Sequence, residues 1–121
     1  MINIDNYSRI PVYQQITDEI KREIVVGILP ADEQLPSVRE LSIGLEINPN
    51  TVQKAYIELE RQGLIRSVPG KGSFVVSDAA EQIKRVIAKE ECEQIRASAK
   101  RLADIGFSEE TVLEWIHEIF R

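Results

Sequence analysis

Four polar residues between Asn50 and Lys54 have side chains that suit the edges of DNA bases. Asn50 and Gln53 can each make a pair of hydrogen bonds to adenine. Thr51 can contact the methyl group of thymine, and Lys54 can bind guanine or a phosphate. The same residues could form the solvated face of an ordinary helix, so the elements around them have to decide between the two interpretations.

The surrounding residues predict two short helices joined by a tight turn. Ser37 and Glu40 have the spacing of a capping box, which predicts a helix over about residues 38–45. Asn48 followed by Pro49 predicts the start of the next helix, because asparagine caps helix ends and proline suits the first position. This second helix would carry the four polar residues in its first turns.

A β-hairpin is expected after the second of these helices. Residues 65–68 and 73–76 are short, β-rich runs, and the segment Pro69-Gly70-Lys71-Gly72 separates them. Helix, turn, helix and hairpin together form a winged helix-turn-helix, which can place one helix in the major groove of DNA. A mainly α fold with a small hairpin is therefore expected.

Four further residues could add DNA contacts to those of the polar quartet. Arg39, one turn into the helix over 38–45, can reach a phosphate or a base edge, or it can pair with a nearby carboxylate. Arg66 on the first strand is a candidate for phosphate contact. Lys71 supplies charge at the hairpin tip, and Gly72 allows the backbone close to a minor-groove wall. A turn that requires unusual backbone angles would also explain the glycines.

The pattern divides the chain into a DNA-binding domain, residues 1–77, and a two-helix part, residues 78–121. The first domain opens with a helix over about residues 11–27. The second part carries more apolar side chains than its two helices can bury alone. We expect it to be a dimerisation element that packs against its copy across a two-fold axis. The residues expected in that interface are Cys92, Ile95, Ala99, Leu102, Val112, Trp115, Ile116, Ile119 and Phe120.

The distribution of charged residues along the chain indicates what kind of partner it can bind. The chain has a formal net charge of −5, which counts against nucleic acid, but residues 49–72 carry four basic and two acidic side chains. A weakly basic face predicts modest, salt-sensitive affinity for each subunit, so double-stranded DNA would be bound by a homodimer. The acidic balance supports one alternative: a winged-helix module for protein–protein contact without specific DNA binding.

The residues indicate neither an enzyme nor a cofactor. Cys92 and His117 are the only cysteine and histidine, and no cysteine or second histidine accompanies His117 in a metal-ligand pattern. No apolar run reaches membrane-spanning length, so we expect a cytoplasmic protein without membrane contact. Two amphipathic helices in residues 78–121 can hardly also enclose a drug-sized cavity, so no dedicated small-molecule pocket is expected there.

In combination, these motifs resemble the GntR family of bacterial transcription regulators, and the short two-helix tail resembles its YtrA-like subfamily. The segments that carry the resemblance are residues 11–16, 35–41, 50–52 with 55–56 and Leu59, 63–65 and 70–75. The resemblance implies a sequence-specific regulator, with a repressor expected, that binds an inverted-repeat operator as a homodimer. It also points to a neighbouring transporter operon as the target.

The resemblance also implies roles for individual residues. DNA contact is implied for Arg39, for the quartet between Asn50 and Lys54, and for the wing around Gly72. Phosphate contact is implied for Tyr13, Ser37 and Tyr56. One departure is that Glu46 stands where the family usually has a glycine. Either Glu46 adopts an unfavourable positive φ, or the turn between the two helices is shifted.

Overall fold

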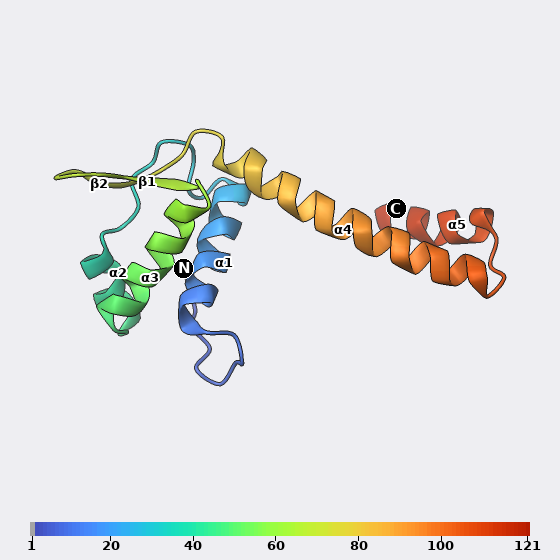
Figure 1. Ribbon diagram of the computed structural model, residues 1–121, viewed down its shortest axis with the longest axis horizontal. Coiled ribbons are helices and arrows are strands. Elements are labelled where there is room, and N and C mark those ends of the chain that lie inside the picture. Colours follow the sequence, from blue (N-terminus) through green and yellow to red (C-terminus); the bar gives the residue numbers. More distant parts are fainter. Residues whose placement is uncertain (1) are drawn as a thin grey trace. The chain divides into compact units, whose positions relative to one another are not determined.

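The computed structural model describes residues 2–121, which form five helices and one two-stranded antiparallel hairpin. In chain order the elements are α1 (Val12–Val26), α2 (Val38–Leu45), α3 (Pro49–Arg61), β1 (Ile65–Val68), β2 (Gly72–Val75), α4 (Ala79–Asp104) and α5 (Glu109–Phe120), labelled in Figure 1. The expected mainly α fold with a small hairpin is confirmed. The chain forms two compact units, one ending at Lys84 and the other spanning Arg85–Arg121.

Local capping chemistry sets the ends of the helices. The Ser37 hydroxyl accepts a hydrogen bond from the Glu40 amide, and the Glu40 carboxylate accepts one from the Ser37 amide, so the expected capping box is present. At the start of α3, the Asn48 side chain accepts a hydrogen bond from the Asn50 amide. These bonds satisfy amides that the first turn of a helix leaves without partners.

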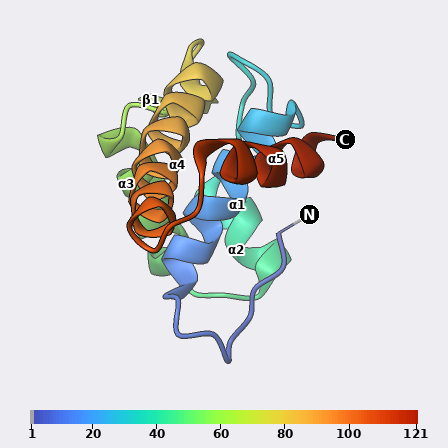
Figure 2. The ribbon, with the colours of Figure 1, turned by 90° about the vertical axis from the view of Figure 1, so that its right-hand side faces the viewer.

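The core of the first unit lies between α1 and α3, with α2 packed against α3 (Figures 1 and 2). The isoleucine stripe of α1 meets the inward stripe of α3, and β1 and β2 each add a buried side chain. The buried apolar residues are Ile16, Ile20, Ile24, Leu35, Val52, Ala55, Tyr56, Leu59, Leu64, Ile65, Val75, Ala79 and Ile83. Removing these side chains from water is the main force that holds the helix-turn-helix together.

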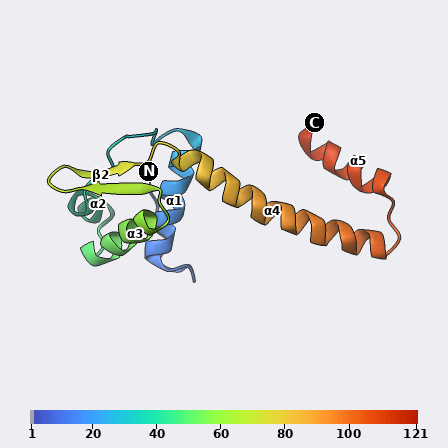
Figure 3. The same cartoon turned by 45° about the horizontal axis from the view of Figure 1, so that its top comes forward.

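The hairpin is an antiparallel pair whose register runs from Ile65 opposite Val75 to Val68 opposite Gly72. Figure 3 shows its two strands side by side with their turn at one end. The second strand begins at Gly72, one residue earlier than the sequence pattern indicated, and ends at Val75. The difference has a simple cause, because Gly72 pairs with Val68 and closes the ladder next to the turn.

In the turn between α2 and α3, Glu46 has the first of the two geometries expected for it, a positive φ. This residue adopts φ 55° and ψ 44°, a left-handed conformation, and directly follows the last residue of α2. Its amide donates to the Ile43 carbonyl over 3.2 Å. The turn is therefore not shifted: Glu46 takes the conformation for which glycine is the usual choice.

The first unit extends beyond the expected boundary at residue 77. Ala79 and Ile83, in the first two turns of α4, are 0% and 6% exposed and belong to the core of this unit. The side chain of Asp78 accepts a hydrogen bond from the Gln82 amide group. The start of α4 is thus structurally part of the winged-helix unit, because it contributes two buried side chains to the core of that unit.

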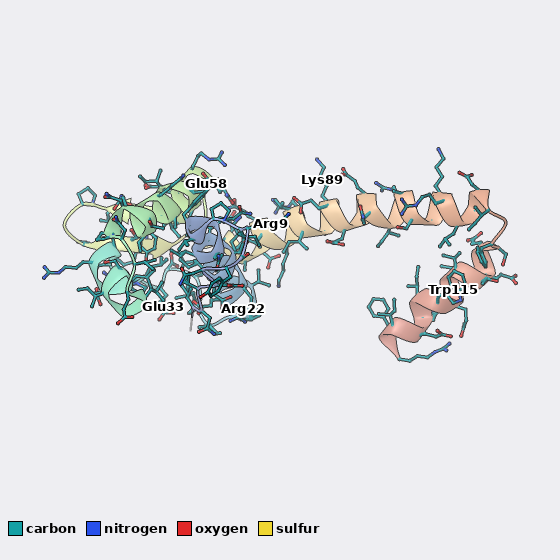
Figure 4. All side chains as sticks on the ribbon, turned by 90° about the horizontal axis from the view of Figure 1, so that it is seen from below. Arg9, Arg22, Glu33, Glu58, Lys89 and Trp115 are labelled. Carbon is teal, nitrogen blue, oxygen red and sulfur yellow. The ribbon has the colours of Figure 1, made fainter. Side chains whose placement is uncertain are left out.

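The second unit exposes apolar side chains throughout. The rings of Phe107 and Trp115 meet edge to face, with 5.1 Å between centroids. No residue of α5 is buried: Trp115 is 40% exposed, Ile119 77% and Phe120 85%. Figure 4 labels Trp115 on α5 and Lys89 on α4. Cys92 on α4 is also exposed.

Candidate nucleic-acid interface

The first turns of α3 present the polar quartet to solvent. Asn50, Gln53 and Lys54 are exposed, and Thr51 is half-buried, while Val52 between them is buried in the core. Helical spacing separates these two faces, so the core anchors the helix and its polar face stays accessible. The amino-terminal end of a helix also carries partial positive charge, which attracts phosphate.

The structure brings two expected DNA-contacting residues together at the seam between α1 and α3. The ammonium of Lys54 lies 4.2 Å from the centroid of the Tyr13 ring. This distance is typical of a cation–π interaction. Because the Tyr13 ring is half-buried, its position is restrained by the residues around it. Lys54 is thereby restrained on the exposed side of α3 before any partner binds.

The two expected contacts at the start of α2, Ser37 and Arg39, differ in their hydrogen-bond and ion-pair partners. Arg39 is exposed, and within residues 2–121 it takes part in no ion pair, so its guanidinium is accessible to a phosphate or a base edge. The Ser37 hydroxyl accepts the capping bond from Glu40. A hydroxyl that accepts one bond can still donate another, so Ser37 can cap α2 and contact a phosphate at once.

Tyr56 differs from the other expected contacts because it is buried. It is 4% exposed, and its hydroxyl donates a hydrogen bond to the Pro36 carbonyl over 2.6 Å. Burial, and to a smaller extent the Glu40 carboxylate, raises the pKa of Tyr56 well above its usual value. In this structure its donor joins α3 to the segment before α2, so a phosphate contact by Tyr56 requires that this bond be exchanged.

The wing carries its charged residues on an ordered ribbon. Arg66 lies over the ring of Phe74, its partner across the hairpin, with 5.5 Å between the guanidinium carbon and the ring centroid. Lys71 is exposed in the turn, and Gly72 adopts a φ of 127°. A residue that was not singled out from the sequence, Gln34, donates from Nε2 to the Lys71 carbonyl over 2.8 Å. No spacing in the sequence links these two residues.

A hollow of about 420 Å³ separates α3 from the hairpin. Gln53 and Glu60 of α3 line one side, and Ser67 and Lys71 of the wing line the other. The Glu60 carboxylate accepts a hydrogen bond from the Ser67 hydroxyl over 3.2 Å, which ties α3 to β1. The helix and the wing are thus held apart at a defined spacing, with polar groups on both walls.

Not every basic side chain of α3 is available to a partner. Arg61 forms an ion pair with Glu58 at 2.5 Å, one turn earlier on the same helix. Hydrogen bonds from Arg61 and Gln62 lower the pKa of Glu58 to about 2. Arg61 therefore neutralises Glu58, and the basic character of the α3 and wing surface rests on Lys54, Arg66 and Lys71.

Residues 2–121 contain neither a metal-binding cluster nor a helix suited to crossing a membrane. No cluster of three or more histidine, cysteine or acidic side chains is arranged to hold a metal ion in this part of the chain. Likewise, none of its helices combines the length and apolarity that crossing a membrane requires.

Comparisons with known proteins extend over both parts of the chain. Residues 12–75 match the family described as bacterial regulatory proteins, gntR family. The HTH-type transcriptional repressor YtrA of Bacillus subtilis (strain 168) is 39% identical over 122 residues, which cover 98% of this chain and 92% of that protein. A crystal structure of a transcriptional regulator from Oenococcus oeni is 36% identical and matches with a TM-score of 0.79 over 100% of both chains.

A further similarity involves a protein solved with DNA. The crystal structure of AraR(DBD) in complex with operator ORR3 matches with a TM-score of 0.55 and 32% identity. The match covers 61% of this chain and 89% of that chain.

Proposed function

The chain belongs to the GntR family of bacterial transcription regulators, and we propose that it is a repressor that binds an inverted-repeat operator as a homodimer. As a member of this family it is a DNA-binding regulator and not an enzyme. One observation carries the proposal further: the exposed polar side chains of Asn50, Gln53 and Lys54 share the capped first turns of α3, next to an ordered wing. This is the arrangement by which a helix reads the major groove.

The proposed base contacts come from α2 and α3, and the proposed backbone contacts surround them. Asn50, Gln53 and Arg39 would read base edges, with Thr51 and Lys54 beside them. The proposed phosphate contacts are Tyr13, Ser37, Tyr56 and Arg66, and the wing tip at Lys71 and Gly72 would approach the minor groove. Support comes from the similarity to AraR(DBD), whose solved structure contains its operator. Phosphate contacts would position the protein, and base contacts would specify the sequence.

The second unit supports the homodimer. Trp115, Ile119 and Phe120 are at least 40% exposed on one short helix, and Ile95 on α4 is 56% exposed. Large apolar side chains exposed in such number are a liability in a monomer and are typical of an interface. We propose that two copies pack through α4 and α5 about a two-fold axis, with Cys92, Ala99, Leu102, Val112 and Ile116 in the same interface.

A dimer also compensates for the weak charge of each half. The whole chain is acidic, with a net charge of −5, so one subunit would bind DNA weakly. Two linked subunits bind far better than one, because the second contact becomes intramolecular. Half-sites in helix-turn-helix operators lie about one helical turn, roughly 10 base pairs, apart, and this spacing defines the inverted repeat that we expect.

The site of action and the target follow as proposals. A regulator of bacterial DNA acts in the cytoplasm, where that DNA lies. We propose a neighbouring transporter operon as the regulated target, which is what the resemblance to the YtrA-like subfamily implies. Because the second unit contains only two helices, we place the control of DNA binding in the dimer interface or between α3 and the wing, with no dedicated effector pocket in α4 and α5.

The deciding experiment is selection of duplexes from a randomised pool by the intact chain, followed by titration at several salt concentrations. We expect an inverted repeat, affinity that falls steeply with salt, and loss of selection for Asn50→Ala. Lys89→Ala on α4 is the control, since it removes one exposed positive charge outside the residues proposed to contact DNA.

The acidic balance keeps a winged-helix module for protein contact as the second candidate. If the chain selects no sequence from the pool, and its association with duplex DNA does not change with the salt concentration, the module for protein contact is favoured over the repressor.

A further inference from the structure

The segment that precedes α2 runs along the free edge of β2. The Leu35 amide donates to the Ser73 carbonyl over 2.8 Å, and the Val75 amide donates to the Glu33 carbonyl over 2.9 Å. Gln34, between them, pairs with Phe74 in an antiparallel bridge. The connecting segment is therefore bonded to the outer edge of β2, which matters because a two-stranded hairpin alone is at best marginally stable in water.

Gln34 extends this support towards the tip of the wing. Its Nε2 donates to the Lys71 carbonyl over 2.8 Å, across 37 positions of sequence. A Cβ atom added to Gly72 would lie only 2.6 Å from the same Nε2 atom. The Gln34 side chain thus occupies the space next to Gly72 and donates a hydrogen bond to the carbonyl of the preceding residue, Lys71.

We infer that Gln34 is a positioning residue that orders the wing tip for DNA. This inference rests on the proposed function, since it gives the tip a role in binding. Gln34 need not touch DNA itself: by holding the Lys71 carbonyl, it fixes where the Lys71 ammonium and the Gly72 backbone are presented. A tip ordered in advance loses less conformational freedom on binding, so more of the contact energy appears as affinity.

The inference also gives Gly72 a second reason to be glycine. The first reason concerns the complex with DNA: without a side chain, the backbone at Gly72 can approach a minor-groove wall closely. The contact with Gln34 explains it within the free protein, because any Cβ would displace the amide group that holds Lys71. The two explanations predict different behaviour when Gln34 is shortened and DNA is absent.

The first test replaces the donor and keeps the length of the side chain. Gln34→Met should accelerate hydrogen exchange of the Lys71 amide, which donates to the Val68 carbonyl in the turn. It should raise the dissociation constant for the operator about tenfold, which corresponds to loss of one good contact. The hydroxyl-radical footprint in the minor groove should disappear, whereas the major-groove contacts of Asn50 should persist. Gln94→Met, on an exposed position of α4, is the control.

A double-mutant cycle separates positioning from general damage to the fold. In a Lys71→Ala background, Gln34→Met should raise the dissociation constant by a smaller factor than in the unaltered chain, because the Lys71 ammonium is gone and only the Gly72 backbone is left to be positioned. Full additivity of the two substitutions would overturn the inference. So would unchanged exchange at Lys71 or an intact minor-groove footprint in Gln34→Met.

A second cycle uses the free protein. Gly72→Ala should lower the melting temperature more in the unaltered chain than in a Gln34→Ala background, because the strain of φ 127° is common to both and only the clash differs. Equal losses in the two backgrounds would contradict the contact between Gln34 and Gly72. Failure of the unaltered chain to select any duplex would instead overturn the proposed function, which these free-protein measurements do not depend on.

Discussion

Lys54 of α3 rests on the ring of Tyr13 of α1, with its ammonium 4.2 Å from the ring centroid. The two residues are far apart in sequence, and the packing of α1 against α3 brings them together. The contact restrains a long, flexible side chain at the place where it would meet DNA, which reduces the entropy lost on binding. Tyr13 therefore has two separable features, a ring that supports Lys54 and a hydroxyl that can reach a phosphate.

Substitutions at Tyr13 should separate these features. Tyr13→Phe keeps the ring and should weaken operator binding only slightly, whereas Tyr13→Ala should lose a further factor of about 2–5, the value of a cation–π contact at an exposed site. Titration of labelled operator measures both, with circular dichroism to verify folding. Equal losses for the two variants would assign the effect to the hydroxyl and not to the ring.

Base readers and phosphate contacts should respond differently to substitution. Asn50→Ala should cost about 1–3 kcal/mol on the cognate operator and relax the sequence preference. Arg66→Ala should weaken binding to all sequences alike and reduce the slope of log affinity against log salt by about 1. Binding to cognate and scrambled duplexes over a salt series measures both. A uniform effect of both substitutions would show that Asn50 reads no base.

Glu46 should be a site where glycine stabilises the protein. Its left-handed φ of 55° carries a penalty of about 1–2 kcal/mol for a residue with a Cβ, and the greater freedom of glycine in the unfolded chain offsets part of that. Glu46→Gly should therefore raise the free energy of unfolding by about 0.5–1 kcal/mol in urea titrations. Glu90→Gly, within the regular helix α4, is the control and should lower it. A decrease for Glu46→Gly would contradict the strained turn.

Tyr56 should make the winged-helix unit sensitive to alkaline pH. Burial raises its pKa in the folded state above the ordinary value near 10, so the unfolded chain loses the tyrosine proton first. The contribution of this group is fully present below about pH 10 and falls as the pH rises further towards the folded-state pKa. Urea unfolding between pH 8 and 11 should show a steeper loss for the unaltered chain than for Tyr56→Phe. Parallel curves would exclude Tyr56 as the cause.

The place of truncation should decide whether the DNA-binding unit folds. A chain ending at Lys84 keeps Ala79 and Ile83 in the core and should fold as a monomer that loses specific operator binding at physiological salt. A chain ending at Ser77 lacks both residues, and exposing the apolar surface that Ile83 covers should cost about 1.5–3 kcal/mol. Sedimentation and thermal melting of both pieces test this. The homodimer would be overturned if the intact chain sedimented as a monomer and bound the operator with the same affinity as the chain ending at Lys84.

The amino-acid sequence by itself determined the helix ends, the hairpin and the family. Those features depend on interactions within a few residues: Ser37 and Glu40 cap α2, Asn48 and Pro49 start α3, and Gly70 lies in the turn of the wing. Local bonds of this kind have the same meaning in any context, so residue type and spacing predict them. The polar residues at the start of α3 were predicted in the same way, because helical periodicity separates them from the buried stripe.

Only the tertiary structure decided which of these residues meet. Gln34 reaches Lys71, Tyr56 donates to Pro36, and Lys54 rests on Tyr13 because three helices and a connecting segment pack in one particular way. The first unit continues to Lys84 for the same reason: whether Ile83 is buried depends on the apolar surface that the rest of the unit leaves open. Contacts between residues distant in sequence depend on the shape of the whole core, and no local pattern of residue types records that shape.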